Sequence, residues 1–461
     1  MNSGQPLPAP PPLAGLCTHA EAAILGVSVD ETVMRLRRYI SIKARSLQLM
    51  AIRFNEMPEW EVKGAFSLHL WQDAEHGTWL RRRVTEMRTP PHHLDKVPDP
   101  ALGAFLNELG QAESPLELLT ALYEVLKPAC VAAFSEHLAQ SNPITDYPTR
   151  RLLHFVLEEE NAQIAWGRLA IAALRERGVT PGDERALNDW CDHLRGFLAA
   201  AGGVNGDAAG SRPGAPASRG RDVTVSQVPQ RDVRFDRVWR SRGVVPGTDR
   251  PVHERIWWMM NVRLQEMHVS ELIASVIAEW RDQPWEFYHD LARHLWDETR
   301  HCMLGEVAFA GQGIAASSLP SHVGFAEYPN TQLAPPDRYA FLWGIEQNLM
   351  TKTGKQAEVA LAKAGEDELA TNFQDFDWAD EVLHAQIGRK WLEPHFKNRE
   401  NMLDVYKRVR PAYDEMKDAD LTLPGRDWWP EFYAKHLKAS ATSAGSAGAS
   451  GMSSVPGTEA Y

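Results

Sequence analysis

The sequence predicts an all-α protein built from two tandem four-helix bundles. Long segments such as 31–57, 116–140, 256–280 and 368–396 repeat apolar residues every three or four positions, as amphipathic helices do. Alternating strand-like runs are few, and the best of them is the short VTVSQV at 223–228. Each half of the chain supplies at least four long helices, which is enough to close a bundle.

Three stretches of biased composition divide the chain. Residues 1–14 are rich in proline and residues 440–461 form a low-complexity tail, so we expect both ends to be disordered. Residues 202–232 are rich in Gly, Ser, Pro and Arg, as a linker between domains would be. These boundaries leave one helical bundle at 15–201 and a second at 233–439.

The composition excludes several classes of protein. The chain has 461 residues and a formal net charge of −12, which argues against a general nucleic-acid binder. Four widely spaced cysteines without a CxxC motif argue against a disulfide scaffold and fit a reducing cytoplasm. No run of 18 or more apolar residues occurs, so we expect a cytoplasmic protein without a membrane-spanning helix.

The two halves resemble each other, which indicates an internal duplication. A shift of 225 residues aligns HLWQDAEH (69–76) with HLWDETRH (294–301) without a gap. A slightly different shift aligns EEENAQI (158–164) with EVLHAQI (381–387). Because both anchors come in the same order, duplication explains them better than chance similarity between helices.

The chemistry-bearing pattern is a pair of Asp-Glu-x-x-His motifs in the second half, at 297–301 and 380–384. A carboxylate and a histidine at i and i+3 lie on one helix face, so both can bind one ion. Imidazole and carboxylate ligands suit iron or manganese. The aspartate before each motif can accept the second N–H of a histidine on a partner helix. The motif residues are Asp297, Glu298, His301, Asp380, Glu381 and His384.

A dinuclear site also needs one glutamate from each of two further helices. Glu271 lies 27 residues before Glu298, and Glu346 lies 35 residues before Glu381. Each spacing is long enough for one helix, a turn and a second, antiparallel helix that brings the two glutamates to the same level of the bundle. Glu266 is an alternative to Glu271, but on a continuous helix it would lie on a different face.

Three further residues near these ligands have ordinary interpretations. His268 is more typical of a packed histidine than of a ligand, and Asp377 is expected in the first turn of a helix. His294 recurs as His69 in the first half, which favours packing or hydrogen bonding. Because His294 is seven residues before His301, we also expect it to lie in the layer around the ligands.

The order Glu, Glu-x-x-His, Glu, Glu-x-x-His resembles that of the ferritin-like di-iron carboxylate proteins, over about residues 260–390. The resemblance implies a four-helix bundle that holds two iron ions, with manganese or a mixed Mn/Fe pair as alternatives. Glu271 and His301 would then serve one ion, and Glu346 and His384 the other. Glu298 and Glu381 would bridge, and Asp297 and Asp380 would orient the histidines.

The first half departs from this pattern. The alignment places Ser46 at the position of Glu271 and Asn161 at that of His384, while Asp73, His76, Glu158 and Glu124 remain. With two ligands and both orienting aspartates missing, we expect no dinuclear site there, and a single weakly held ion is the alternative. A bundle that kept the fold as a structural or regulatory partner explains this copy better.

The leading functional hypothesis is an oxidase or oxygenase that activates O2 at the dinuclear site and oxidises a small organic substrate. No flavin or Fe–S motif is visible, so electrons would come from an external reductase. One alternative is a ferroxidase or peroxide-detoxifying protein without an organic substrate. The other is a non-catalytic scaffold stabilised by metal. The sequence is compatible with a homodimer.

Overall fold

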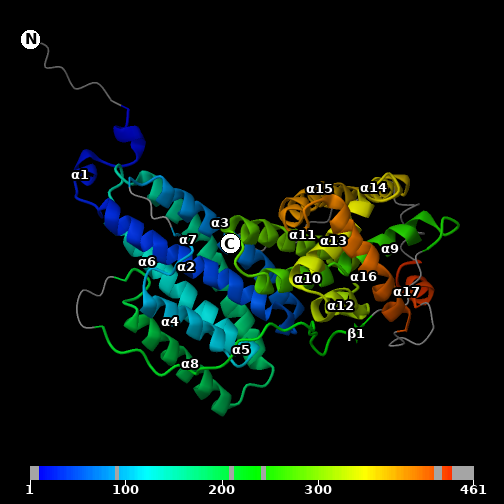
Figure 1. Ribbon diagram of the computed structural model, residues 1–461, viewed down its shortest axis with the longest axis horizontal. Helices are drawn as coiled ribbons and strands as arrows, with labels where there is room; N and C mark the ends of the chain where they lie inside the picture. Colours follow the sequence, from blue (N-terminus) through cyan, green and yellow to red (C-terminus); the bar gives the residue numbers. More distant parts are fainter. Residues whose placement is uncertain (1–9, 89–92, 207–211, 240–245, 420–427, 439–461) are drawn as a thin grey trace, which may run out of the picture. The chain divides into compact units, whose positions relative to one another are not determined.

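The computed structural model describes residues 10–88, 93–206, 212–239, 246–419 and 428–438. The described chain is predominantly helical, so the prediction of a helical protein is confirmed (Figure 1). The two short strands that it contains are β1 (Arg237–Val238) and β2 (Ser321–His322), which pair in parallel. The predicted disordered tail at 440–461 lies outside the described residues, as do the first nine residues.

The chain divides into two compact units. Unit 1 comprises residues 1–227 and 274–296, and unit 2 comprises residues 228–273 and 297–461. The boundary between residues 227 and 228 lies inside the expected linker at 202–232. The division is not a simple tandem split, since 274–296 belongs to unit 1. Trp285 accounts for part of this grouping, because its indole lies against Gly77 and donates a hydrogen bond to Thr78 at 2.9 Å.

Unit 1 is a set of packed helices in which α2 lies along α3, α7 packs on α3 and α6, and α4 packs on α8 (Figure 1). Caps and prolines explain several starts: Ser28 accepts from the backbone N–H of Glu31, and prolines occupy the first turns of α4, α5, α7 and α8. The helices are α1 (His19–Ala22), α2 (Val29–Arg53), α3 (Trp60–Thr85), α4 (Pro100–Glu108), α5 (Pro115–Thr120), α6 (Lys127–Gln140), α7 (Tyr147–Glu176) and α8 (Pro181–Ala200), with short helical turns η1 (Leu13–Gly15), η2 (Phe54–Glu56), η3 (Leu109–Gln111) and η4 (Ala121–Leu126).

Unit 2 is organised around the long helix α15, which packs on α13, α14 and α16 (Figure 1). Helix α9 also packs on α14. Helices α10 and α11 run across the boundary between the units. The helices are α9 (Val252–Leu264), α10 (Met267–Glu279), α11 (Trp285–Ala310), α12 (Gly324–Gln332), α13 (Pro335–Leu349), α14 (Lys355–Ala364), α15 (Glu368–Phe396), α16 (Arg399–Ala419) and α17 (Trp429–His436), with the turn η5 (Ala316–Ser318).

The described part of the expected linker has no regular secondary structure, and VTVSQV is not a strand. The linker is nevertheless anchored to unit 1 by side-chain contacts. Arg219 pairs with Glu117 at 2.8 Å, and its guanidinium lies 3.9 Å from the ring centre of Trp190. Glycine and proline content gave no sign of these arginine contacts.

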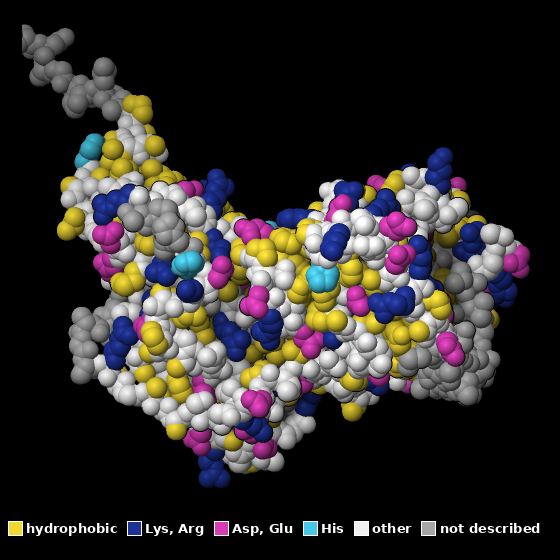
Figure 2. Space-filling model, viewed as in Figure 1, with side chains coloured by type: hydrophobic (Ala, Val, Ile, Leu, Met, Phe, Trp, Pro, Cys, Tyr) yellow, Lys and Arg dark blue, Asp and Glu magenta, His cyan; other side chains and the backbone are white. Residues whose placement is uncertain are grey.

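One segment of unit 1, Pro115–Gln140, is long and apolar enough to cross a membrane by length and composition alone. In its most apolar window 67% of the residues are buried inside the unit, as expected for a core helix. The segment also carries the buried charge of Lys127. These features are compatible with a soluble protein. On the face shown in Figure 2, acidic and basic side chains are interspersed.

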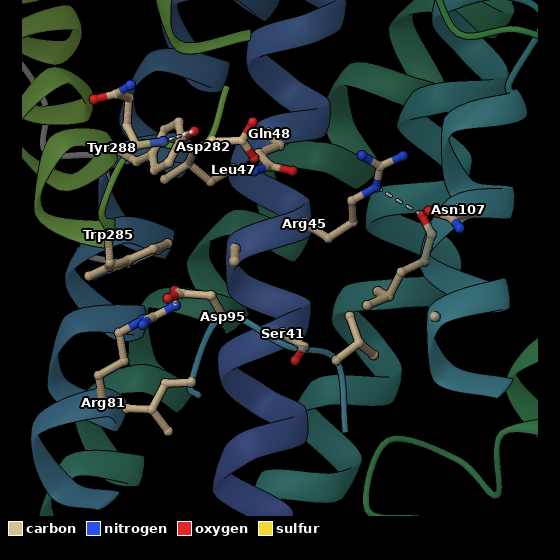
Figure 3. A pocket seen from close by; sticks show the side chains of 16 residues that line it. Ser41, Arg45, Leu47, Gln48, Arg81, Asp95, Asn107, Asp282, Trp285 and Tyr288 are labelled. Atoms are coloured by element: carbon tan, nitrogen blue, oxygen red, sulfur yellow. Dashed lines mark hydrogen bonds and ion pairs between the residues drawn. The ribbon is translucent and has the colours of Figure 1, made fainter. Parts of the chain in front are cut away.

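Unit 1 also contains a cavity of about 360 Å³ between α2, α3, α4 and the start of α11 (Figure 3). At one side of it Arg81 pairs with Asp95 at 2.7 Å and lies 4.5 Å from the ring centre of Trp285. Arg45 lines the cavity from α2 and donates from Nε to the carbonyl of Leu106 at 3.1 Å. None of the described lining residues is a histidine.

Candidate metal centre

Buried carboxylates and histidines cluster in unit 2, on the two helices that carry the Asp-Glu-x-x-His motifs. Helix α11 contributes Glu298 and His301, and α15 contributes Glu381 and His384, each pair spaced i and i+3. All four side chains are at most 3% exposed. Burial of so much charge is costly unless it is compensated, so the cluster is unlike an ordinary helix surface.

Glu298 spans the two histidines. Its Oε1 lies 3.1 Å from Nδ1 of His384, and its Oε2 lies 3.7 Å from Nδ1 of His301. The two imidazole rings are 5.8 Å apart between centres. Glu381 Oε2 lies 3.9 Å from Nδ1 of His384. One carboxylate oxygen of Glu381 also belongs to the group of ligand atoms around His301. Glu298 therefore lies between the two histidines, and Glu381 lies near His384 while belonging to the group around His301.

The aspartates that precede the motifs orient the histidines crosswise. Nε2 of His301 on α11 lies 3.3 Å from Oδ2 of Asp380 on α15, and Nε2 of His384 lies 3.4 Å from Oδ2 of Asp297. Because an ionised carboxylate only accepts, each histidine donates from Nε2 and keeps the Nδ1 lone pair for the centre. Arg300 donates to both aspartates, at 2.7 Å to Asp380.

Glu346 completes one group of potential ligands. It is 3% exposed on α13, and a carboxylate oxygen of Glu346 lies within 4.8 Å of ligand atoms of Glu298 and His384. We call this group the His384 position. His294 is fully buried one turn before Glu298 on α11, hence on the same helix face.

A second group, the His301 position, contains two residues that the sequence did not favour. Its members are Glu266, His301, Asp377 and Glu381, whose ligand atoms all lie within 4.8 Å of one another. Nδ1 of His301 is 3.3 Å from Asp377 Oδ1 and 3.6 Å from Glu266 Oε2. The expectation of a first-turn role for Asp377 was wrong, since α15 begins at Glu368 and Asp377 is fully buried two turns further on.

Glu271 lies outside both groups. It forms an ion pair with Arg231, whose Nη2 is 3.1 Å from Glu271 Oε2. The physical reason is a break in the helix: α9 ends at Leu264 and α10 begins at Met267. The helical register expected for one continuous helix is therefore lost, and Glu266, at the break, lies beside His301. Five of the six predicted ligands come together, with Glu266 in the place expected for Glu271.

Two buried cations also reach the His301 position, and sequence reasoning missed both. Arg263 forms ion pairs with Asp377 and, at 3.0 Å, with Glu266. Lys355 lies 2.7 Å from Asp377 Oδ2 and 3.1 Å from Glu381 Oε1. Asp377, Glu381 and His384 at i, i+4 and i+7 gave a sequence signal for one polar helix face, but no local pattern pointed to Arg263 or Lys355.

The pKa values of the clustered side chains are shifted by burial and by the charges of their neighbours. Burial, together with the Asp377 charge, raises the pKa of Glu266 to about 8 against the opposing effect of Arg263. Burial and Glu298 raise the pKa of Glu381. Burial alone would lower the pKa of His301, yet the surrounding carboxylates, Asp377 foremost, raise it to about 10. The cluster thus favours extra positive charge, supplied by protons or by cations.

The donor set fits metal ions. At metal–ligand distances of about 2.1 Å, two ligand atoms on one ion stand roughly 3.0–3.4 Å apart. The 3.1 Å between Glu298 and His384 and the 3.3 Å between His301 and Asp377 lie in this range. Among the described residues, Glu266 Oε2, Glu381 Oε2 and His301 Nδ1 are buried and make no hydrogen bond. Such atoms are costly to bury unless something binds them. Carboxylate and imidazole ligands together suit iron or manganese.

His268 does not join either group. Its ring packs 4.7 Å from the ring centre of Phe325, and burial lowers its pKa to about 4. The interpretation of His268 as a packed histidine therefore agrees with its surroundings.

Unit 1 contains a related cluster in which two lysines stand among the carboxylates. Asp73, His76 and Glu160 are fully buried and close enough to hold an ion. Lys43 Nζ lies 2.7 Å from Asp73 and also contacts Glu160, while Lys127 Nζ lies 3.3 Å from Asp73 and 3.2 Å from Glu160. Each ammonium group thus touches both carboxylates, as a metal ion between bridging ligands would.

The buried residues of unit 1 differ from those that the sequence alignment placed opposite the second-half motifs. Glu158 and Asn161 are exposed, whereas Glu160 is buried and lies in the cluster with Asp73 and His76. Glu124 lies in the π-helical turn η4 and pairs with Arg175 at 3.3 Å rather than with the cluster. A wide turn of this kind changes which residues face inward, and Lys127, directly after it, enters the cluster.

Comparison with known proteins gave no match: no family model, curated protein or solved structure is similar to this chain at the level required for significance. The geometry of the buried cluster in unit 2 is therefore the feature that points to a function.

Proposed function

We propose that unit 2 is a ferritin-like bundle that binds two divalent iron ions and uses them to oxidise a small organic substrate with O2. Manganese or a mixed Mn/Fe pair would suit the same ligands. The observation that carries the proposal is the position of Glu298 between two histidines, each oriented by an aspartate of the opposite helix. An accidental cluster of charges would not need this crosswise support.

The ligand assignment follows from the two groups of atoms. Glu346 and His384 would hold one ion, and Glu266, His301 and Asp377 would hold the other. Glu298 and Glu381 would bridge them. When bound, such a pair of ions supplies the electrons for a two-electron reduction of O2.

The protein's own residues prepare the site. Asp297 and Asp380 each keep a proton on Nε2 of one histidine, so that the Nδ1 lone pairs face inward. Burial would raise the pKa of Asp297, but His384 and Arg300 hold it well below its usual range, so this acceptor stays ionised. The proposed ligands are at most 8% exposed, which limits access of bulk water.

We propose further that unit 1 is a duplicated bundle without a metal centre. Its carboxylates Asp73 and Glu160 are neutralised by Lys43 and Lys127, so the fold would persist without metal. Electrons for repeated turnover would come from an external reductase in the cytoplasm, since the sequence has no flavin or Fe–S motif.

Anaerobic reconstitution of the full chain with Fe²⁺, followed by addition of O2, tests the proposal. We expect two Fe per chain and rapid oxidation of those two ions. Oxidation of many Fe²⁺ per chain with deposition of ferric mineral would favour a ferroxidase instead. Tightly bound iron that never reacts with O2 would favour a metal-stabilised scaffold, and the absence of bound metal would refute the metal centre.

A further inference from the structure

Lys355 is the first residue of α14 and is only 1% exposed. Its ammonium group touches two carboxylates of α15 that belong to the His301 position. Nζ is 2.7 Å from Asp377 Oδ2 and 3.1 Å from Glu381 Oε1. A buried ammonium group at this place is a charge that any ion in the His301 position must face.

The lysine engages one oxygen of each carboxylate and leaves the other directed at a histidine. Asp377 Oδ1 lies 3.3 Å from Nδ1 of His301, and Glu381 Oε2 lies 3.9 Å from Nδ1 of His384. Lys355 thus holds one oxygen of each carboxylate, while the other oxygen of Asp377 lies between His301 and Arg263 and that of Glu381 lies toward His384. It also ties α14 to the ligand-bearing face of α15.

Every carboxylate that belongs to the His301 position already has a cationic side chain beside it. Arg263 contacts Glu266 and Asp377, and Lys355 contacts Asp377 and Glu381. Unit 1 shows the limiting case of the same arrangement, since Lys43 and Lys127 there each contact both buried carboxylates.

We propose that Lys355 is a positioning residue that makes the two metal positions unequal. It fixes the orientation of Asp377 and Glu381, and its charge weakens the binding of the ion beside His301, which is therefore loaded second. This inference rests on the proposed metal centre and deepens it. The weaker ion is the one that exchanges, so occupancy of the His301 position sets how much of the protein is dinuclear.

Titration of the metal-free full chain with Co²⁺ tests the inference without using activity. Bound Co²⁺ absorbs visible light, and calorimetry gives the affinity of each step. The wild type should bind two ions in two steps whose affinities differ at least tenfold. In Lys355→Met the second step should tighten by about tenfold or more, because one positive charge near a dication is removed. The first step should change much less.

Matched variants separate this role from a structural one. Lys355→Arg keeps the charge and should restore the two unequal steps. Lys352→Met, which changes an exposed lysine three residues earlier, should behave as the wild type. If Lys355 only stabilised the fold, Lys355→Met should bind the second Co²⁺ ion more weakly rather than more tightly. If Lys355→Met does not fold without metal, Lys355→Gln keeps a hydrogen-bond donor and should show the same tightening.

Two equal steps in the wild type, or an unchanged or weaker second step in both neutral variants, would overturn the inference while leaving the metal centre in place. No Co²⁺ binding by the wild type would instead refute the proposed metal centre itself.

Discussion

His301 donates from Nε2 to Oδ2 of Asp380 over 3.3 Å, and this bond links α11 to the opposite motif on α15. If Asp380 orients a ligand, Asp380→Asn should weaken binding of the ion beside His301 by about 10- to 100-fold. Asp375→Asn removes an exposed carboxylate from the same helix and serves as the control. Equal metal affinity in both variants, measured by competition with a chelator, would argue against the orienting role.

The helix break at residues 265–266 yields a second prediction, because it exchanges the roles of two glutamates. Glu266→Gln should lower the affinity for one of the two ions, since Glu266 Oε2 faces His301 at 3.6 Å. Glu271→Gln should leave two ions bound and loosen the segment around Arg231 instead. Metal analysis after dialysis distinguishes them, and loss of an ion from Glu271→Gln alone would restore Glu271 as a ligand.

The lysine-filled cluster of unit 1 predicts stability without metal. Asp73→Asn removes one of two carboxylates that neutralise Lys43 and Lys127, and breaking a buried pair costs about 3–5 kcal/mol. The free energy of unfolding should therefore fall by this amount while the metal content stays at that of the wild type. A normal stability with one ion lost per chain would mean that unit 1 binds metal after all.

His69 predicts an acid sensitivity of unit 1. Burial, with a contribution from Lys127, lowers the pKa of His69 to about 3, whereas an unfolded histidine titrates near 6.5. Between these values the unfolded chain binds the extra proton, so stability falls as the pH drops, by up to about 1.4 kcal/mol per pH unit.

His69→Gln can still hydrogen-bond to Tyr123, whose hydroxyl lies 2.6 Å from the histidine, but it cannot titrate. Urea unfolding at pH 7 and pH 5 should therefore show a smaller loss of stability in this variant than in the wild type. His19→Gln, at an exposed position, should retain the wild-type pH dependence. The same pH dependence in all three proteins would contradict the assignment.

Local patterns predicted the parts of the centre that depend on a single helix. The Asp-Glu-x-x-His motifs identified Glu298, His301, Glu381 and His384 because i and i+3 share a face on any continuous helix. Glu266 was set aside because the break between α9 and α10 cannot be read from apolar spacing. Tertiary packing determines which of the two glutamates, Glu266 or Glu271, lies beside His301.

The buried cations show a second limit of sequence reasoning. Lys43, Lys127, Arg263 and Lys355 look like ordinary surface residues in the sequence, since charged side chains are mostly exposed. They are buried because each meets carboxylates from other helices, up to 117 residues away for Lys43 and Glu160. Partners so distant in sequence leave no local signal.

The most direct test of the account is the metal content of the full chain compared with that of two variants. After anaerobic reconstitution with Fe²⁺ and removal of excess metal, the wild type and Asp73→Asn should each retain close to two Fe per chain. Glu298→Ala, which removes the carboxylate between the two histidines, should retain almost none. Absence of iron from the wild type, or equal retention by Glu298→Ala, would contradict a dinuclear centre in unit 2.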